Sequence, residues 1–167
     1  MVYSIISFQR AHATAIAQVM HQAVQHIHHV RYPQAKLDAW SKQPRSTEYW
    51  RRQCVNGPSW VIVDCDQQVC GFISCDKPSR QQCHVAHLYI DPSHQRKQLA
   101  TLLVKHLQAW AKTQPLNAIT VDASHLSKGV FSQCGFVVTM KSIQRKRSQS
   151  LNGFYMTYQM PEDEKAQ

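Results

Sequence analysis

The chain carries the stretch HLYIDPSHQRKQLATLL at residues 87–103, and its fold can be predicted outward from there. A strand pattern ends at Asp91-Pro92, a short basic loop follows, and apolar residues then recur at helical spacing in a helix expected to begin near Lys97. Such a turn directs free backbone N–H groups and the positive end of a helix dipole towards one point. This arrangement favours phosphate binding, to which Arg96 and Lys97 add charge.

Alternating and helical hydrophobic patterns predict the elements before this stretch. In order, they are a strand at residues 2–8, a helix from about 11 to 29, a short helix around 37–40, a helix between Ser46 and Asn56, and strands at Ser59–Cys65, Gln68–Cys75 and Gln82–Ile90. Asp66-Gln67 is expected to form a tight turn between the first two of these strands.

After the helix that Gln114-Pro115 ends, the pattern predicts a strand, a short helix and two further strands. They are Ala118–Val121, a helix reaching Gln133, Phe136–Gln144 and Gly153–Gln159, with a basic, serine-rich loop between the last two. The order β-α-α-β-β-β-α-β-α-β-β predicts an α/β fold of the α+β type, a mixed sheet with helices on both faces. We expect one domain at residues 1–160 and a disordered acidic tail at 161–167.

Bulk composition narrows the class of protein. The 167 residues are 43% hydrophobic, which is typical of a globular chain, and the apolar runs are too short to span a bilayer. No signal-peptide pattern is found at the start, so we expect a cytoplasmic protein. The six cysteines include no Cys-x-x-Cys pair, which favours reduced thiols without structural zinc.

The net charge of +9, with ten further histidines, indicates an anionic partner: a phosphorylated cofactor, an acidic substrate or nucleic acid. Most basic residues are spread along the chain, and Arg145-Lys146-Arg147 is the exception. This run could attract an acidic substrate, but a charged hairpin that protects a sheet edge from aggregation is the favoured interpretation.

Two motifs resemble the GNAT superfamily of acetyl-CoA-dependent N-acetyltransferases. The first is Leu88-Tyr89-Ile90-Asp91-Pro92 followed by Gln95-Arg96-Lys97-Gln98-Leu99-Ala100, and the second is Val121-Asp122-Ala123-Ser124 followed by Val130-Phe131-Ser132-Gln133-Cys134-Gly135-Phe136. The likeness covers the element order of nearly the whole chain and is closest between Val69 and Phe136. Tyr32 with Leu37-Asp38-Ala39-Trp40, and the closing strand Gly153–Met160, are similar to a bacterial branch of acetyltransferases.

The resemblance implies a GNAT-like acyl-CoA N-acyltransferase fold and transfer of an acetyl group from acetyl-CoA to a primary amine of a small molecule or peptide. The cofactor-binding residues that it implies are Leu88, Tyr89, Ile90, Gln95, Arg96, Lys97, Gln98, Leu99, Ala100, Thr101 and Ser124. Leu88 to Ile90 would act through backbone N–H groups, exposed because their strand splays from the strand after Asn117. Expected partners are acetyl-CoA and an amine acceptor, and a homodimer is an open alternative to a monomer. No membrane, nucleic acid or metal is expected.

Two residues depart from the family pattern. Gln98 stands where the family has a glycine that lets the backbone approach the pyrophosphate. Phe131 stands where many members have a tyrosine that protonates the leaving thiolate, and phenylalanine has no proton to donate. The departures motivate an alternative function, an acyl-CoA-binding or sensing domain without turnover, and the charge motivates a second, a nucleic-acid-directed protein.

Three residues are catalytic candidates. His84, six residues before Ile90, is the preferred general base, because an imidazole titrates near neutral pH. His87 is second, and its opposite parity on a regular strand predicts that one of the two histidines faces away from the cleft. Tyr155 is a candidate acid, as is Tyr158. The alternatives are half-exposed strand histidines and packing tyrosines; Ser124 could equally cap a helix.

Two further groups of residues, three aromatic side chains and four histidines, each have a functional and a structural interpretation. Tyr32, Trp40 and Trp50 either line the acceptor pocket or pack in the core. A histidine group invites comparison with a metal site: His21, His26, His28 and His29. Only some of these can share a helix face, and no cysteine or carboxylate accompanies them, so no metal is predicted there.

Overall fold

The computed structural model describes residues 2–161, and the acidic tail predicted at residues 161–167 lies, apart from Pro161, outside them. The expected order of strands and helices is confirmed, with two short 3-10 turns added. The elements are β1 Ser4–Ser7, η1 Arg10–His12, α1 Ala13–Gln25, α2 Gln34–Ser41, α3 Thr47–Val55, β2 Ser59–Val63, β3 Val69–Cys75, β4 Gln82–Ile90, η2 Pro92–His94, α4 Leu99–Lys112, β5 Ala118–Ser124, α5 Lys128–Gln133, β6 Val137–Lys146 and β7 Gln149–Gln159.

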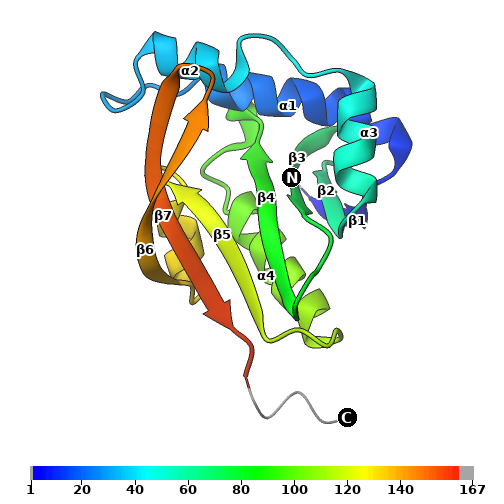
Figure 1. The fold of residues 1–167 in the computed structure, drawn as a ribbon. Helices are drawn as coiled ribbons and strands as arrows, with labels where there is room; N and C mark the ends of the chain where they lie inside the picture. The colour runs from blue at the N-terminus through cyan, green and yellow to red at the C-terminus, as the bar shows by residue number, and fades with distance from the viewer. Residues whose placement is uncertain (1, 162–167) are drawn as a thin grey trace.

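The strands form one mixed sheet in the order β1-β2-β3-β4-β5-β7-β6 (Figure 1). β4 and β5 are parallel, because α4 carries the chain back along the sheet between them, and the other neighbouring pairs are antiparallel. The parallel pair lies near the middle of the sheet, where the strand direction changes. Ligands commonly bind at such a point in α/β sheets.

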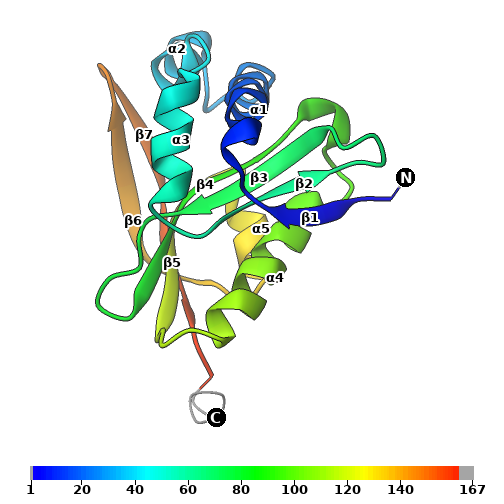
Figure 2. The same ribbon diagram turned by 90° about the vertical axis from the view of Figure 1, so that its right-hand side faces the viewer.

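Helices cover both faces of the sheet, as the sequence predicts (Figure 2). On one face α1 and α3 pack through a core that includes Ile16, Trp50 and Phe72. On the other face α4 and α5 pack through a core that includes Leu103 and Phe131. The sheet is therefore buried on both sides over its central strands.

α4 shows how the sequence specifies this packing. Its buried side chains recur at helical spacing, at Leu99, Leu103, Val104, Leu107 and Ala111. Burial of each leucine contributes roughly 1.5–3 kcal/mol before the entropy cost of ordering the chain is counted. The helix is thus held with its N-terminus at the end of β4.

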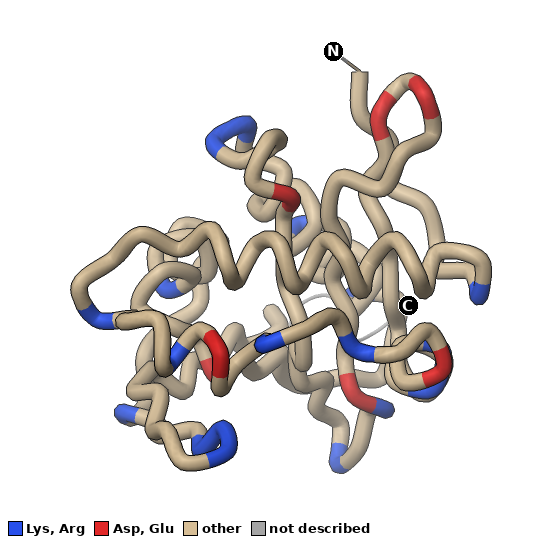
Figure 3. The backbone as a smooth tube through the Cα atoms, turned by 90° about the horizontal axis from the view of Figure 1, so that it is seen from above, with Lys and Arg blue, Asp and Glu red and all other residues tan. Residues whose placement is uncertain are grey.

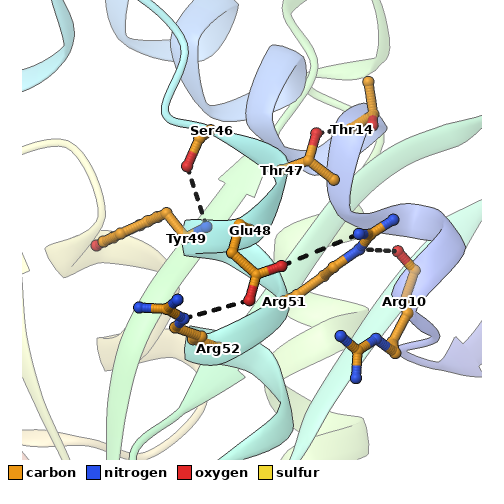
Figure 4. Close-up of polar contacts among 8 residues, drawn as sticks. All are labelled: Arg10, Thr14, Ser46, Thr47, Glu48, Tyr49, Arg51 and Arg52. Carbon is orange, nitrogen blue, oxygen red and sulfur yellow. Dashed lines mark hydrogen bonds and ion pairs between the residues drawn. The ribbon is translucent and has the colours of Figure 1, made fainter.

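α3 is fixed by polar contacts at its first turns (Figure 4). Ser46 caps the helix, and its Oγ accepts a hydrogen bond of 3.1 Å from the backbone N–H of Tyr49. Glu48 pairs with Arg52 at 3.2 Å and with Arg51 at 4.0 Å. These contacts stabilise the first turns of α3, and they leave Glu48 with two arginine partners.

The prediction of a basic loop between the last two strands is wrong. β6 runs on through Lys146, which pairs with Gln149, and only a tight turn at Arg147-Ser148 separates the strands. Arg147 adopts φ 53°, a left-handed conformation suited to such a turn. Alternation continues through the basic run, since Gln144 and Lys146 are half-buried while Arg145 is exposed.

β6 is an edge strand of the sheet, and it exposes apolar side chains at Val137, Met140 and Ile143. All six cysteines are free thiols, and five of them are buried. Within residues 2–161, no helix combines the length and the apolar character needed to cross a bilayer.

Candidate active site

A gap in the sheet lies between β4 and β5. The two strands pair from Gln82↔Ala118 to Val85↔Val121 and then separate, so residues 86–90 of β4 have no ladder partner in β5. A cavity of about 880 Å³ is lined by both strands beyond this point. The volume lies at the upper end of the range typical of ligand sites. The splayed strand pair predicted from the family resemblance is confirmed.

A β-bulge at Ala86 sets which side chains enter this region. In the pairing of β3 with β4, Ser74 opposes His87 and Cys75 opposes Val85, so Ala86 is the extra residue. The prediction that His84 and His87 face opposite sides is therefore wrong. The bulge shifts the alternation by one position, and both histidines lie on the α1–α3 face.

The loop between β4 and α4 forms one wall of the cavity. Lining residues from the predicted cofactor set are Leu88, Tyr89, Ile90, Gln95, Arg96, Gln98, Leu99, Ala100, Thr101 and Ser124. No side chain caps the N-terminus of α4, so its first backbone N–H groups are available to a ligand. Lys97 lies outside the lining, and its Nζ donates hydrogen bonds to the Tyr3 hydroxyl and the Ser93 carbonyl.

Gln98 keeps the backbone conformation of the glycine that it replaces. It adopts φ 60° and ψ 16°, in the left-handed region, and α4 therefore begins at Leu99 and not near Lys97. Arg96 also has a positive φ of 59°. A left-handed conformation costs an L-residue roughly 1–2 kcal/mol. The loop geometry is thus retained, at the expense of backbone strain.

His84 belongs to a polar group at the closed end of the strand gap. Its Nδ1 shares a hydrogen bond of 2.9 Å with the Thr120 hydroxyl, and its Nε2 lies 3.5 Å from Oδ2 of Asp122. Tyr155 stacks on the imidazole with ring centroids 6.1 Å apart. Asp122 lines the cavity, whereas His84 and Tyr155 do not, so His84 communicates with the cavity through the Asp122 carboxylate.

His87 lies in the cavity wall in a very different environment. Its Nδ1 shares a hydrogen bond of 2.9 Å with the buried Ser74 hydroxyl, and its ring packs on Trp50. Burial, reinforced by the charges of Lys146 and Arg45, lowers the pKa of His87 to about 4. The imidazole is therefore neutral at physiological pH, and its affinity for a proton is low for a general base.

Aromatic side chains form part of the wall on the α1–α3 face. Trp40 Nε1 donates a hydrogen bond of 2.9 Å to the Tyr89 hydroxyl, and burial raises the pKa of Tyr89. Tyr32 packs beside Trp40 and also lines the cavity. Trp50 lies outside the lining, buried behind His87. Of the three predicted acceptor-side aromatics, the structure therefore brings two to the cavity.

Ser124 and Phe131 also line the cavity. The Ser124 Oγ accepts hydrogen bonds from the backbone N–H groups of Leu126 and Ser127, so Ser124 organises the turn before α5 without being its N-cap, which is Ser127. Phe131 is 1% exposed and packs on Phe136. Its ring offers the cavity an apolar surface and no proton.

The sequence alone assigns no role to two residues of the site, Asp122 and Arg45. Asp122 belongs to a motif that the sequence shows, and it is the one charged residue of the strand AITVDAS, which is an available signal. Arg45 and Lys146 also line the cavity. The proximity of Arg45 and Lys146 depends on how the β6–β7 hairpin and the loop before α3 meet in the fold, which no local pattern shows.

The histidines for which the sequence predicts no metal lie in α1 (His21) and just after it (His26, His28 and His29), and they are together called the α1 histidines. His26, His28 and His29 line the cavity, and His21 bonds to the Ser41 hydroxyl. Among residues 2–161, a group of three possible metal ligands is found at another place in the fold. It consists of Asp64, Cys70 and His94, whose ligand atoms lie within 4.8 Å of one another. The α1 histidines therefore receive no metal assignment.

Comparison with known proteins agrees with this geometry. A family model described as an acetyltransferase (GNAT) domain matches residues 18–156. The uncharacterized N-acetyltransferase YafP of Escherichia coli (strain K12) is 30% identical over 151 residues, which cover 90% of this chain and 89% of YafP. The chain belongs to the GNAT acetyltransferase family.

Solved structures show the same fold. A GCN5-related N-acetyltransferase from Rhodopseudomonas palustris superposes with a TM-score of 0.83 at 18% identity, over 96% of this chain and 99% of that one. The protein yncA of Salmonella typhimurium, solved with its cofactor acetyl-CoA, superposes with a TM-score of 0.74 at 21% identity, over 97% and 96% of the two chains. The predicted fold class is confirmed.

Proposed function

We propose that this GNAT enzyme transfers the acetyl group of acetyl-CoA to a primary amine of a small molecule or peptide, by direct attack within a ternary complex. The observation that carries the proposal is the path of the cavity. It connects the uncapped N-terminus of α4 with the carboxylate of Asp122 through the gap between β4 and β5. A donor and an acceptor can therefore meet inside one space.

The residues at the α4 end fit a pyrophosphate. Backbone N–H groups of the first helical turn and the Arg96 guanidinium provide hydrogen bonds and positive charge at one point. When bound, acetyl-CoA would supply the acetyl group as an activated thioester. Backbone N–H groups of β4 beyond Val85, unpaired with β5, are placed to polarise the thioester carbonyl.

Deprotonation of the amine is assigned to His84 together with Asp122. A free amine is mostly protonated at neutral pH, so its proton must leave before the nitrogen can attack the carbonyl carbon. Asp122 faces the cavity and receives the ammonium group, and His84 accepts the proton through the carboxylate or a water molecule. As the C–N bond forms and the C–S bond breaks, the nitrogen releases its second proton to solvent. The thiolate leaves and takes a proton from solvent, since Phe131 has none to give.

Tyr155 is proposed as a positioning residue. Its ring stacks on His84 outside the cavity lining, so it orients the imidazole towards Thr120 and Asp122. His87, neutral and bonded to Ser74, is proposed as a polar part of the acceptor wall.

The first experiment measures thermal unfolding with and without acetyl-CoA. A ligand at 100 times its Kd adds about 2.7 kcal/mol of stability, which is a clear rise in Tm. We expect this rise in the wild type, a weaker rise in Arg96→Glu, and an unchanged rise in Lys105→Glu, which alters an exposed residue of the same helix outside the cavity. No rise in the wild type would contradict donor binding.

The same samples are then assayed for coenzyme A release with a panel of amines. His84→Gln should bind acetyl-CoA normally and lose turnover by about 100-fold or more, the usual contribution of a general base. Donor binding without any acetyl transfer would instead support the alternative of a sensing domain. Retention on RNA that persists at high salt would oppose a mainly electrostatic nucleic-acid interaction.

A further inference from the structure

Two cations enclose one side of the cavity on the α1–α3 face. Arg45 comes from the loop before α3, and Lys146 ends β6 at the tip of the β6–β7 hairpin. Both act on the same neighbour, because each contributes to the lowered pKa of His87. The Arg45 guanidinium also lies 5.0 Å from the centre of the Tyr49 ring, which holds it in place.

Neither cation has an acidic partner among residues 2–161. The ion pairs there join Arg51 and Arg52 to Glu48, and His84 to Asp122. Glu48, three residues from Arg45 in sequence, is directed to the other two arginines (Figure 4). Asp122 is the one Asp or Glu in the cavity lining, and it contacts His84.

Lys146 therefore has no compensating negative charge in a partly buried place, with the exposed guanidinium of Arg45 near it. Lys146 is half-buried, and both burial and the charge of Arg45 lower its pKa. Charges taken out of water without a partner are costly, and an anion placed between them removes that cost. An arginine and a lysine at one site suit the oxygen atoms of a carboxylate or a phosphoryl group.

We propose that the acceptor is an amine that also carries a carboxylate or phosphoryl group, with the anion between Arg45 and Lys146 and the amine at Asp122. The proposal rests on the proposed function and specifies its substrate class. Trp40, Tyr32 and Tyr49 line the cavity on the same face and suit an apolar or aromatic side group of the acceptor. The negative charge of Asp122 and the positive charges of Arg45 and Lys146 are complementary to the amine and the anion of a zwitterionic acceptor.

The test compares amines that differ only in the anionic group. L-phenylalanine is paired with phenethylamine, and 2-aminoethylphosphonate with ethanolamine, in an assay of coenzyme A release at saturating acetyl-CoA. We expect kcat/KM to be about 10- to 100-fold higher for the anionic member of at least one pair, as for hydrogen bonds between charged groups. Lys146→Gln and Arg45→Gln should each remove most of this preference while acetyl-CoA still raises Tm.

Lys141→Gln is the matched control, since Lys141 is an exposed residue of β6 outside the cavity and its loss should leave the preference unchanged. Arg45 is exposed in a loop, so Arg45→Gln remains informative if Lys146→Gln folds poorly. Equal use of both members of each pair, or a preference that neither cavity variant alters, overturns the substrate class alone. Absence of both a Tm rise and turnover contradicts the proposed function itself.

Donor binding without turnover of any of the four amines calls for a direct titration. L-phenylalanine and phenethylamine are added to the wild type and to Lys146→Gln, and intrinsic tryptophan fluorescence is followed, to which Trp40 in the cavity wall contributes. Tighter binding of L-phenylalanine that is lost in Lys146→Gln supports the anion site. Equal binding of the two compounds, or binding of neither, overturns it.

Discussion

At the scale of single residues, the cofactor loop combines a glycine-like backbone with a glutamine side chain. Gln98 at φ 60° is strained, and it lines the cavity at the start of α4, where we propose that the pyrophosphate binds. The left-handed conformation and the uncapped helix N-terminus both persist with glutamine at this position. We therefore expect Gln98 to lower stability and donor affinity without removing the proposed site.

Gln98→Gly should raise both stability and affinity for acetyl-CoA. Relief of strain gives roughly 1–2 kcal/mol, and the greater freedom of glycine in the unfolded chain offsets part of it, which leaves a net gain of about 0.5–1 kcal/mol. Denaturant unfolding measures the stability, and isothermal titration measures the Kd for acetyl-CoA.

Gln67→Gly is the control for this substitution. Gln67 is also a glutamine at φ 60°, in the turn between β2 and β3 and outside the cavity. It should gain similar stability with no change in Kd. If Gln98→Gly binds acetyl-CoA no more tightly than Gln67→Gly does, the Cβ at position 98 does not hinder the donor.

At the scale of elements, the sequence predicts more of the fold than of the site. The apolar repeats of α1 and α4 and the alternation of the strands place every helix and strand in order, and the bounds of β4 are predicted without error. The basic loop preceding α4 was predictable because its backbone geometry is local. Residues 87–103 carry that information within one continuous segment.

The parts of the prediction that failed depend on the pairing of neighbouring strands. The bulge at Ala86 is visible only when β4 is set against β3, and it reverses the expected facing of His84 relative to His87. Extension of β6 through Lys146 likewise depends on its ladder with β7. Both errors shift side chains at the acceptor side, so the acceptor side was the least predictable part of the site.

β5 and β7 pack closely at Gly153, so this position should not tolerate a larger side chain. Gly153 pairs with Ser124 and lines the cavity, and a Cβ there would lie 2.4 Å from the Ala123 carbonyl oxygen, a backbone atom that cannot rotate away. Gly153→Ala should therefore push the strands apart and lower the free energy of unfolding by about 1–3 kcal/mol. Denaturant unfolding, with the acetyl-CoA Tm rise as a second readout, measures the effect.

Gly129→Ala provides the opposite expectation. Gly129 lies inside α5, and a Cβ there would meet nothing within 4 Å. Alanine should stabilise the protein by about 0.5–1 kcal/mol, because glycine is a poor helix former. Equal behaviour of the two variants would show that the strand contact at Gly153 is more tolerant than its geometry indicates.

At the scale of the whole molecule, the charge of +9 is dispersed. Lys and Arg occur on many separate segments of the backbone rather than on one face (Figure 3). A nucleic-acid surface usually shows clustered basic residues along one side. The pair at Arg45 and Lys146 is notable within this pattern because both residues line the cavity, where the half-buried charge of Lys146 has a larger effect than a fully exposed charge.

The lowered pKa of His87, to which Lys146 and Arg45 contribute, makes the free energy of unfolding depend on pH. The folded protein lowers the pKa of His87 from 6.5 to about 4 by burial, Lys146 and Arg45, so the unfolded chain binds the proton more readily between these values. Stability therefore falls as the pH falls from about 6.5 towards 4, and it changes no further from this group below 4. The shift corresponds to a loss of about 3 kcal/mol.

His87→Gln should remove this part of the acid destabilisation, since an amide can retain the hydrogen bond to Ser74 but does not titrate in this range. Urea unfolding at pH 7 and at pH 4.5 should show a smaller loss of stability in the variant than in the wild type, by about 2 kcal/mol. His28→Gln, which removes an exposed histidine, should behave as the wild type does. If the loss between the two pH values is the same in all three proteins, His87 is not held neutral by its surroundings, and the two cations do not act on it as described.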